Sequence, residues 1–369
     1  MNTIKVLQVG ADNIGHGGRS TIAFNLTNNM NSKKITNDFL AFKEIDGFYK
    51  EKIRSNGGKI VYLGSLTGNK FKKKIVRFVR TFNLLKQEKY DVLHIHADNT
   101  LEAYSTAIIG KFAGVRKILI HAHVTGESGK KDILKNFLIK VCRILVKESN
   151  YEKIAVSKES AEYMFGSLKD VHIVQNGIDI RKYTFNSQIR HKQLKKMNIK
   201  NDFVVGCVAR LTKVKNLSFL VDVFNDISVL KKNSKLILVG DGELLSTLKN
   251  QVKKDKIEDK VLFLGNKKNV NDIMQAFDVF VLPSFHEGLG LVNIEAQASG
   301  LPCVVSTGIP KAAKVLDTFT FLSLKDSKKI WVNKILELQK AKREDTSQKM
   351  LEAGYDIKKS AKEIEEMYV

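Results

Sequence analysis

Two glutamates stand with seven residues between them in the stretch SFHEGLGLVNIEAQASGLP, residues 284–302. Glu287 precedes a glycine-rich bend, and Glu295 follows it on a predicted short helix that Gly300 and Pro302 end. Because carboxylates accept hydrogen bonds from diols, Glu295 could bind a ribose and Glu287 a reacting sugar. The alternative is a helix whose exposed acids are stabilised by the helix dipole.

Two cations follow a predicted strand in the segment CVARLTKVKNLSFL. Arg210 comes directly after the strand, and Lys215 stands five residues later, just before a predicted helix. A departing nucleoside diphosphate gains negative charge, which Arg and Lys can neutralise where other enzymes use Mg²⁺. The sequence has no D-x-D motif, which agrees with a site that needs no metal. Two ordinary surface cations are the alternative.

A glycine-rich loop, GADNIGHGGRSTIAFNL, follows the first predicted strand and opens a helix. Gly17 and Gly18 let the backbone approach a ligand, and free N–H groups at the helix start could receive a phosphate or a sugar hydroxyl. Ser20 stands where the dinucleotide fingerprint G-x-G-x-x-G requires its last glycine, so the loop does not match that fingerprint. A tight strand-to-helix turn is the alternative.

Short apolar runs alternate with helical patterns along both halves of the chain, which predicts an α/β fold with mostly parallel sheets. Ligands of such sheets bind at the carboxyl ends of the strands, so we expect two doubly wound, Rossmann-like domains facing each other across a crevice. The polar stretch at residues 186–202 has little apolar pattern and predicts a hinge. The domains are therefore placed at residues 1–185 and 186–351. The strands of this prediction are IKVLQVG, DFLAF, KIVYLG, DVLHIHA, KILIHAH, KIAVS and VHIVQNG in the first half, and DFVVGCVA, SKLILVGDG, KVLFLG, DVFVLPS and LPCVVS in the second.

The composition is that of an ordinary globular protein, with 43% hydrophobic and 27% charged residues. Cys142, Cys207 and Cys303 are odd in number and lack C-x-x-C spacing, so we expect neither disulfides nor a zinc site. The start of the chain lacks the pattern of a signal peptide, and no apolar run is long enough to span a bilayer. We therefore expect a cytoplasmic protein.

The net charge of +23 is concentrated in the first 200 residues, which carry 36 Lys and Arg against 17 Asp and Glu. Two amphipathic segments contribute most, KFKKKIVRFVRTFNLLK and KKDILKNFLIKVCRILVK. Both could be helices that pack their apolar stripe on a core and expose a basic face. The alternative is attraction to an anionic membrane surface, where such helices would bind at the inner face of the cell membrane.

The order of these motifs resembles that of the retaining GT-B glycosyltransferases of family 4, which carry a Glu-x7-Glu motif. The likeness spans nearly the whole chain and is closest to bacterial exopolysaccharide and capsule transferases. It rests on GHGGRSTIAFNL, DVLHIHAD, ILIHAH, AVSKES, VQNGID, VARLTKVKN, VGDGELL, FLGN and LPSFHEGLGLVNIEAQASGLP. One segment departs from the family, because TGIPKAAKVLD stands where a glycine-rich turn followed by an acid is usual.

The resemblance implies a role for each matching residue. Arg210 and Lys215 would bind the diphosphate, and Gly17 and Gly18 would form the loop that faces the phosphate. The family places Glu295 on the ribose, Glu287 on the donor sugar and Asn266 near the base, with N–H groups of Gly290 and Leu291 on the sugar. His123 matches a histidine near the donor sugar and acceptor, whereas His94, His96 and His121 are expected only to pack. Glu287, His123, Arg210 and Lys215 are the catalytic candidates.

The resemblance further implies transfer of a hexose, with retention and without a cofactor or metal, from a UDP-sugar to a lipid-linked or oligosaccharide acceptor. It places the helix at residues 352–369 on the first domain. A nucleotide-sugar epimerase or hydrolase of similar architecture is one alternative. A nucleic-acid-binding protein is another that the charge alone permits, but no zinc finger or RNA-recognition signature accompanies it, so no nucleic-acid partner is expected.

Overall fold

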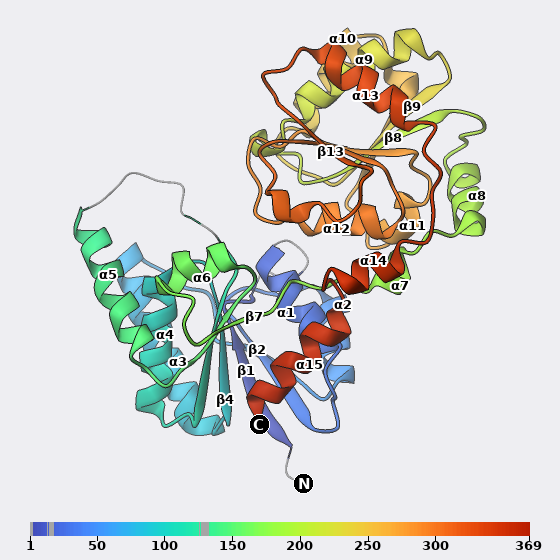
Figure 1. Ribbon diagram of the computed structural model, residues 1–369. Helices are drawn as coiled ribbons and strands as arrows, with labels where there is room; N and C mark the ends of the chain where they lie inside the picture. Colours follow the sequence, from blue (N-terminus) through green and yellow to red (C-terminus); the bar gives the residue numbers. More distant parts are fainter. Residues whose placement is uncertain (1–2, 13, 15–17, 125, 127–132) are drawn as a thin grey trace. The chain divides into compact units, whose positions relative to one another are not determined.

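A computed structural model describes residues 3–12, 14, 18–124, 126 and 133–369. The chain forms two compact units (Figure 1). Unit 1 comprises Met1–Gly177 together with Ile357–Val369, and unit 2 comprises Ile178–Asp356. Each unit is built on a parallel sheet, so the predicted α/β class and the pair of Rossmann-like domains are confirmed.

Unit 1 has a seven-stranded parallel sheet in the order β3-β2-β1-β4-β5-β6-β7. Its strands are β1 (Ile4–Val9), β2 (Ile35–Ala41), β3 (Ile60–Tyr62), β4 (Val92–Ala97), β5 (Lys117–Ala122), β6 (Glu152–Ala155) and β7 (Val171–Ile173). Its described helices are α1 (Gly18–Asn28), α2 (Gly47–Ser55), α3 (Lys70–Glu88), α4 (Thr100–Ala113), α5 (Ile133–Lys147), α6 (Lys158–Phe165) and α15 (Ile357–Tyr368).

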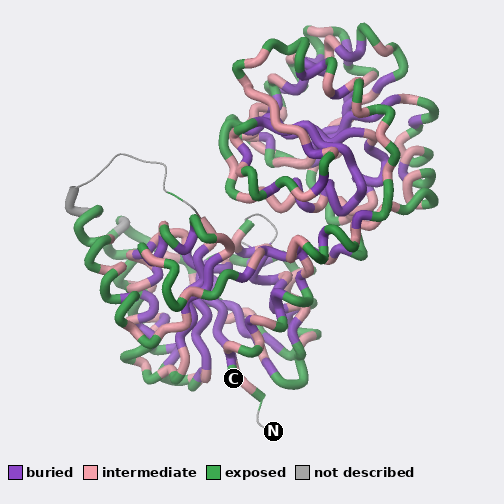
Figure 2. The backbone as a smooth tube through the Cα atoms, in the orientation of Figure 1, coloured by how far each residue is buried: buried purple, intermediate pink, exposed green. Residues whose placement is uncertain are grey.

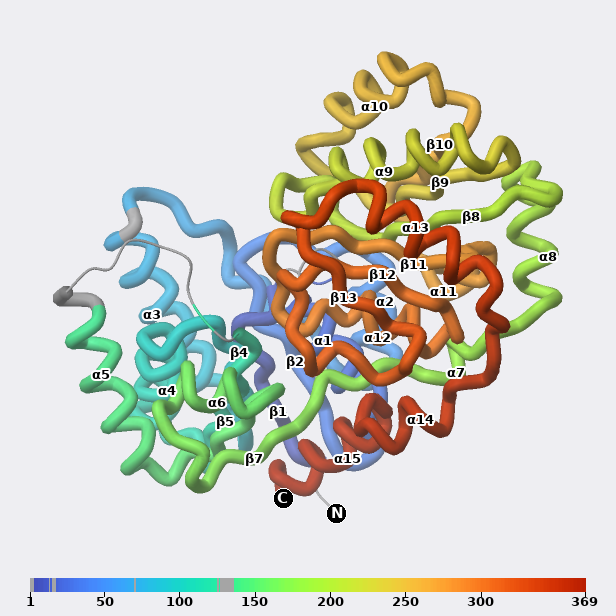
Figure 3. Tube along the Cα trace, turned by 45° about the horizontal axis from the view of Figure 1, so that its top comes forward, coloured from blue at the N-terminus to red at the C-terminus, as the bar shows by residue number. Residues whose placement is uncertain are grey.

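Helices cover both faces of this sheet. On one face α4 lies beside α3 and α5, as the views in Figures 1 and 3 agree. On the other face α1 packs against α15, through which the end of the chain returns to unit 1. A separate buried cluster lies under each layer, one including Leu7, Leu93 and Ile95 and the other including Phe24 and Phe39. Period-two alternation in the central strands supplies both clusters, because successive side chains point to opposite faces.

Unit 2 has a six-stranded sheet in the order β10-β9-β8-β11-β12-β13. Its strands are β8 (Phe203–Val208), β9 (Ser234–Val239), β10 (Val261–Gly265), β11 (Val279–Leu282), β12 (Cys303–Ser306) and β13 (Phe319–Leu322). Its helices are α7 (Ile180–Tyr183), α8 (Ser187–Lys196), α9 (Leu217–Leu230), α10 (Leu245–Lys254), α11 (Val270–Met274), α12 (Leu291–Ala298), α13 (Lys328–Leu338) and α14 (Ser347–Glu352), and 3₁₀ turns cover Lys213–Lys215, Glu258–Lys260 and Lys311–Ala313.

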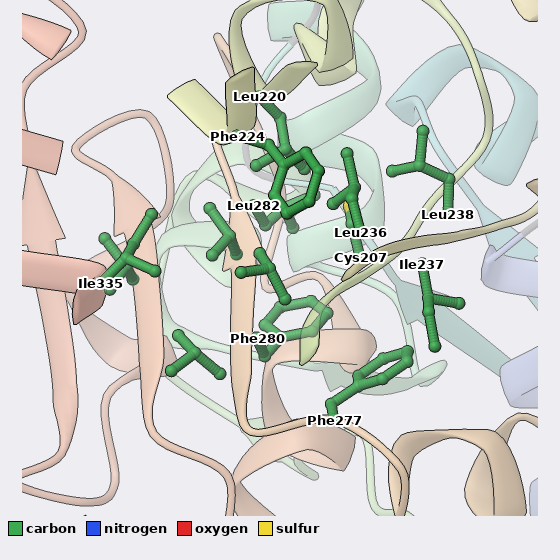
Figure 4. Close-up of a cluster of buried hydrophobic side chains, with 14 of the residues drawn as sticks. Cys207, Leu220, Phe224, Leu236, Ile237, Leu238, Phe277, Phe280, Leu282 and Ile335 are labelled. Atoms are coloured by element: carbon green, nitrogen blue, oxygen red, sulfur yellow. The ribbon is translucent and has the colours of Figure 1, made fainter. Parts of the chain in front are cut away.

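The main core of unit 2 is a large cluster of aliphatic and aromatic side chains around the sheet (Figure 4), and a smaller buried cluster includes Ile180, Ile294 and Met350. Figure 2 shows the same pattern in the backbone, with largely buried central strands and exposed residues mainly on the outer parts of the helices and loops. Phe277 packs where β8 has Gly206, and a Cβ on Gly206 would lie 2.1 Å from the Phe277 ring. A glycine in the middle of this strand is therefore required by the close approach of the ring.

The predicted hinge at residues 186–202 is wrong, because this stretch contains the helix α8 within unit 2. Asn186 caps α8 by accepting from the N–H groups of Gln188 and Ile189. Arg190 fastens the helix by donating to the carbonyls of Gln275 and Phe277. These anchors are polar, so the weak apolar pattern of the stretch gave no sign of them. The division between the units falls instead at residues 177 and 178, since α7 packs against α11, α12 and α14.

Candidate functional site

The strand order of unit 2 reverses between β8 and β11, because the chain runs from β8 outward to β10 and then returns to β11 on the other side. Loops that leave the carboxyl ends of two such strands diverge and leave a recess, which is where doubly wound sheets bind their ligands. Arg210 follows β8 and Glu287 follows β11, so both residues lie beside this switch point.

Lys215 and Glu287 form a salt bridge at this place. Their side chains are only 17% and 10% exposed, so the pair is largely withdrawn from water. Ser284 Oγ donates to the same carboxylate oxygen of Glu287 at 2.9 Å. The structure thus pairs a cation predicted to meet phosphate with an acid predicted to meet sugar. An arriving anion could be received by this ammonium while the carboxylate accepts from hydroxyls.

Main-chain hydrogen bonds hold the loops around this salt bridge. The N–H of Phe285 donates to the carbonyl of Val214 at 2.8 Å, which joins the loop after β11 to the turn that carries Lys215. The N–H of Glu287 donates to the carbonyl of Gly308 at 3.0 Å, which joins it to the loop after β12. The backbone positions of Lys215 and Glu287 are therefore fixed by these main-chain hydrogen bonds, in addition to the salt bridge between their flexible side chains.

Other predicted donor-binding residues surround the same edge of the sheet. Arg210 and Asn266 are exposed at the carboxyl ends of β8 and β10. Gly290, at the N-cap of α12, has a φ of +65°, and a Cβ there would lie 2.8 Å from Asn293 Nδ2 and 3.7 Å from Glu287 Oε2. Glycine is thus needed for the bend that presents Leu291 and the start of α12, where helix N–H groups favour an anion or a hydroxyl.

Glu295 lies one helical turn into α12 and forms a hydrogen bond with the Tyr183 side chain of α7. Burial raises the pKa of Glu295 to about 7, and the bond from Tyr183 opposes part of that rise. The same environment raises the pKa of Tyr183 well above its ordinary value. Near neutral pH this carboxyl can therefore both donate and accept hydrogen bonds. Tyr183 was missed from the sequence, where nothing in the segment IRKY distinguishes it.

In unit 1 the strand order reverses between β1 and β4. Gly18 begins α1 in the loop that follows β1, and Gly17 lies outside the described residues. Arg19 forms a salt bridge of 2.6 Å with Asp98, which follows β4. This pair was not predicted from the sequence, although each residue follows a predicted strand.

His94, His96, His121 and His123 form a stacked group at the ends of β4 and β5, which we call the histidine cluster. His96 and His121 are register partners in the sheet, and neighbouring rings lie 4.3–5.5 Å apart. Burial lowers the pKa of all four imidazoles, and their mutual proximity lowers it further for His94, His96 and His123. The cluster is therefore neutral at physiological pH. The structure places His123 within it, hydrogen-bonded to His96 at 2.9 Å.

Nitrogens of His94, His96 and His121 lie within 4.8 Å of one another, a spacing that a metal ion could use. The rings of His94 and His96 stack at 4.3 Å with an interplanar angle of 25°. A ring donates its lone pair in its own plane, so stacked rings do not direct their lone pairs at a common point. Most of their nitrogens are also engaged in hydrogen bonds. The geometry thus fits a hydrogen-bonded network better than a metal centre.

The α3 and α5 helices expose the apolar stripes that the sequence predicted. Phe71 is 73% exposed on α3, and Phe137 and Ile144 are 61% and 62% exposed on α5. Only the C-terminal part of the α3 stripe packs inward, where Leu85 is buried. Packing on a core therefore does not account for these stripes among the described residues. The exposed apolar side chains of the stripes are Phe71, Ile75, Phe78 and Val79 on α3, and Phe137, Leu138, Val141, Ile144 and Leu145 on α5. No described helix is long and apolar enough to cross a membrane.

A groove of about 660 Å³ lies along α3 and α4 in unit 1. Its walls combine apolar side chains, including Phe78 and Leu101, with the cations Lys74 and Arg77. Arg77 also forms a 3.2 Å salt bridge with Glu102 of α4. The groove can therefore hold an amphiphilic molecule whose polar part is anionic.

Comparisons with known proteins match each half of the chain to a glycosyltransferase family model. Residues 16–182 match the family described as Glycosyltransferase Family 4, and residues 189–356 match Glycosyl transferases group 1. The Bacillus subtilis protein EpsF, which is named as a glycosyltransferase, is 30% identical over 96% of this chain and 94% of its own. An Escherichia coli UDP-Gal:alpha-D-GlcNAc-diphosphoundecaprenol alpha-1,3-galactosyltransferase is 32% identical over 63% of this chain and 62% of its own.

Solved structures show the same fold. Anabaena HepE, crystallised in complex with UDP, matches with a TM-score of 0.76 and 19% identity, covering 99% of each chain. WaaG, a glycosyltransferase involved in lipopolysaccharide biosynthesis, matches with a TM-score of 0.71 and 13% identity, covering 97% of this chain and 99% of its own. The resemblance drawn from the sequence is thus confirmed: the chain belongs to the family 4, group 1 glycosyltransferases and has their GT-B fold.

Proposed function

We propose that this glycosyltransferase transfers a hexose from a UDP-sugar to a hydroxyl of a lipid-linked or oligosaccharide acceptor, in the biosynthesis of a bacterial surface polysaccharide. The observation that carries the proposal is the Lys215–Glu287 salt bridge beside the exposed Arg210 at the switch point of unit 2. The names of two relatives support the proposed donor, acceptor and pathway. One is named for UDP-Gal and a diphosphoundecaprenol acceptor, and the other is an O-antigen biosynthesis glycosyltransferase.

In this proposal Arg210 and Lys215 bind the diphosphate and neutralise the charge that it gains as it leaves. Two cations can perform the task that Mg²⁺ performs elsewhere, so no metal or other cofactor is needed. Glu287 orients the donor sugar and stabilises positive charge near its anomeric carbon. The acceptor hydroxyl then attacks the face from which the diphosphate departs, which retains the configuration of that carbon.

The remaining residues hold the donor in place. Glu295 binds the ribose hydroxyls, Asn266 lies near the base, and the N–H groups of Gly290 and Leu291 bind sugar hydroxyls. In unit 1, His123 and the loop that includes Gly17 and Gly18 complete the contacts with sugar and phosphate. The groove along α3 and α4 would receive the amphiphilic acceptor, because its cations suit a phosphate and its apolar wall suits a lipid chain.

Two measurements test this function. A thermal-shift panel of nucleotide sugars should show stabilisation by one UDP-sugar, since a ligand that binds only the folded form raises the melting temperature with its occupancy. Incubation of that donor with a polyprenyl diphosphate-linked sugar should then release UDP and lengthen the acceptor by one hexose of retained anomeric configuration. An isomerised donor, or free sugar with an unchanged acceptor, would contradict transfer and identify an epimerase or hydrolase.

The same proposal places unit 1 at the cytoplasmic face of the membrane. Exposed apolar stripes flanked by Lys and Arg suit an anionic bilayer, where each well-placed cation adds about 1 kcal/mol of binding. Phe71→Ser with Phe137→Ser should reduce flotation with vesicles containing anionic lipid by about tenfold or more. Val229→Ser is the matched control, because Val229 is 73% exposed on α9 in unit 2. Equal flotation of all variants, or binding insensitive to salt and lipid charge, would reject this placement.

A further inference from the structure

The histidine cluster continues into a chain of buried polar side chains that the proposed chemistry does not by itself require. Gln8 of β1 is fully buried, and Tyr368, the last residue of α15, is also fully buried. Gln8 Oε1 lies 2.8 Å from His96 Nε2, and Gln8 Nε2 lies 3.0 Å from the Tyr368 hydroxyl. The cluster is thus tied both to the first strand and to the far end of the chain.

The orientation of the Gln8 amide fixes which atoms carry protons. Its nitrogen donates to Asn37 Oδ1 at 2.8 Å and to the Tyr368 hydroxyl. Asn37 is itself oriented, because its own Nδ2 faces the thioether sulfur of Met30, which can only accept. Gln8 Oε1 is therefore directed at His96 and accepts a hydrogen bond from its Nε2–H group.

This arrangement determines the tautomer of His123. His96 donates from Nε2 to Gln8, and since the imidazole is neutral its Nδ1 carries only a lone pair. His123 Nε2 lies 2.9 Å from that lone pair and must be the donor. The Nδ1 atom of His123 is thus left as an acceptor, and this buried atom has no hydrogen-bond partner among the described residues.

A second series of hydrogen bonds connects Gln8 through Tyr368 and His94 to His121, and it ends at a different histidine. The Tyr368 hydroxyl accepts from Gln8 and can donate its own proton to His94 Nδ1, which lies 2.7 Å away. With that direction, His94 donates from Nε2 to His121 Nδ1 at 3.3 Å, and His121 carries its proton on Nε2. This chain does not pass through His123. The two hydrogen-bond chains share only Gln8, so a substitution at Tyr368 perturbs the second chain alone, whereas a substitution at Gln8 perturbs both.

We propose that Gln8 and His96 are positioning residues that hold His123 in the Nε2–H tautomer, so that its Nδ1 lone pair accepts a hydrogen bond from a hydroxyl of the donor sugar or of the acceptor. The ligand class rests on the proposed function, whereas the tautomer rests only on the contacts described above. A buried acceptor with no partner is costly to leave unsatisfied, and a sugar hydroxyl supplies the missing donor. In the opposite tautomer His123 would offer an N–H and bind the hydroxyl oxygen instead.

The test that does not depend on activity is ¹⁵N NMR of the histidine side chains in the full chain, with His123→Gln used to assign the signal. We expect His123 to show a protonated Nε2 and an unprotonated Nδ1 at pH 7. A protonated Nδ1, or a cationic ring, would overturn the proposal.

Two variants then distinguish the hydrogen-bond chain that ends at His123 from the one that ends at His121: Gln8→Met perturbs both chains and Tyr368→Phe only the second. Gln8→Met preserves volume but removes the acceptor for His96, and we expect mixed tautomers at His123 and a fall in kcat of about tenfold or more. Tyr368→Phe should change the His94 and His121 signals and leave the His123 tautomer unchanged. An unchanged His123 signal or an unchanged kcat in Gln8→Met would overturn the proposal. If Gln8→Met does not fold, the spectrum of the wild-type protein still tests the tautomer of His123.

Substrate dependence shows which hydroxyl is bound. If it belongs to the donor sugar, Gln8→Met weakens binding of the UDP-sugar but not of UDP; if it belongs to the acceptor, only the KM for the acceptor rises. Equal effects on UDP and UDP-sugar would contradict a hydroxyl contact. If wild-type enzyme turns over no UDP-sugar, the proposed function fails while the NMR result still decides the tautomer.

Discussion

The Lys215–Glu287 salt bridge allows stability and catalysis to be separated by a double-mutant cycle. Exposed salt bridges contribute about 0–1 kcal/mol, whereas removing one partner of a fully buried pair costs about 3–5 kcal/mol. With side chains 17% and 10% exposed, this pair lies nearer the second case. Glu287 also keeps the hydrogen bond from Ser284 when Lys215 is lost. We therefore expect Lys215→Met to lower the free energy of unfolding of unit 2 by about 2–3 kcal/mol.

The double variant should recover much of this loss. Glu287→Gln removes the carboxylate that Lys215→Met leaves unpaired, so Lys215→Met with Glu287→Gln should be more stable than the sum of the single changes predicts, by at least about 1 kcal/mol. Activity should behave differently. Each single change removes a group proposed to stabilise the transition state and should lower turnover about a hundredfold or more, with no recovery in the double variant.

Urea unfolding followed by circular dichroism gives the stabilities, and release of UDP in the presence of acceptor gives the rates. Lys215→Arg is the control, since it keeps the charge. Additive losses of stability would show that the two side chains are not coupled in solution. Near-normal turnover in Lys215→Met, or restored turnover in the double variant, would refute the catalytic role and leave the pair a purely structural feature.

Three further predictions concern stability. Burial raises the pKa of Glu295 from 4.5 to about 7, so between these pH values the folded protein retains a proton that the unfolded chain loses. The free energy of unfolding should therefore fall by up to about 3 kcal/mol as the pH rises from about 4.5 to 7. Urea titrations at several pH values should show that Glu295→Gln abolishes this part of the fall; an identical pH profile would contradict the assignment. The histidine cluster acts in the opposite sense, because burial lowers the pKa values of its imidazoles. Below about pH 6.5 the unfolded chain binds protons that the folded protein excludes, so each histidine should lower the free energy of unfolding by up to about 1.4 kcal/mol per pH unit. A melting temperature equal at pH 7 and pH 5 would argue against a neutral cluster. Gly206→Ala should destabilise unit 2 by about 1–3 kcal/mol because its Cβ would meet the Phe277 ring, whereas Gly288→Ala has open space and should change stability little; equal melting temperatures would show that the ring can move away.

Much of the fold could be predicted because its signal is local. Apolar runs such as IKVLQVG and DVFVLPS have the length and the β-branched composition of buried parallel strands, and each became one. The short strand β13 was missed, since FTFL is brief and only its first residue is fully buried. Helix α8 was taken for a hinge because hydrophobic periodicity does not report polar attachments such as Arg190 and the Asn186 cap. Few apolar side chains of the helix, such as Leu194, pack on the core.

The site was predictable in its residue types but not in its pairings. Motif spacing placed Lys215 and Glu287 in loops that each follow a strand. That these strands are neighbours, and that a salt bridge joins residues 72 positions apart, depends on how the sheet and the two loops fold. Tyr183 bonds Glu295 from a four-residue helix that has no sequence signature. The histidine cluster did leave a signal, because His94 and His96, and likewise His121 and His123, are two residues apart and so share one face of the sheet.

The central claim is that unit 2 binds the diphosphate of a nucleotide through cations alone. Isothermal titration of UDP in the presence of EDTA tests it most directly, with wild-type protein, Arg210→Ala and Lys215→Met compared against Lys213→Ala, a neighbouring cation of the same turn. We predict one UDP bound per chain, with affinity lowered at least about tenfold in the first two variants and little changed in the third. Equal affinity in all four proteins, or binding that appears only when Mg²⁺ is added, would contradict the claim.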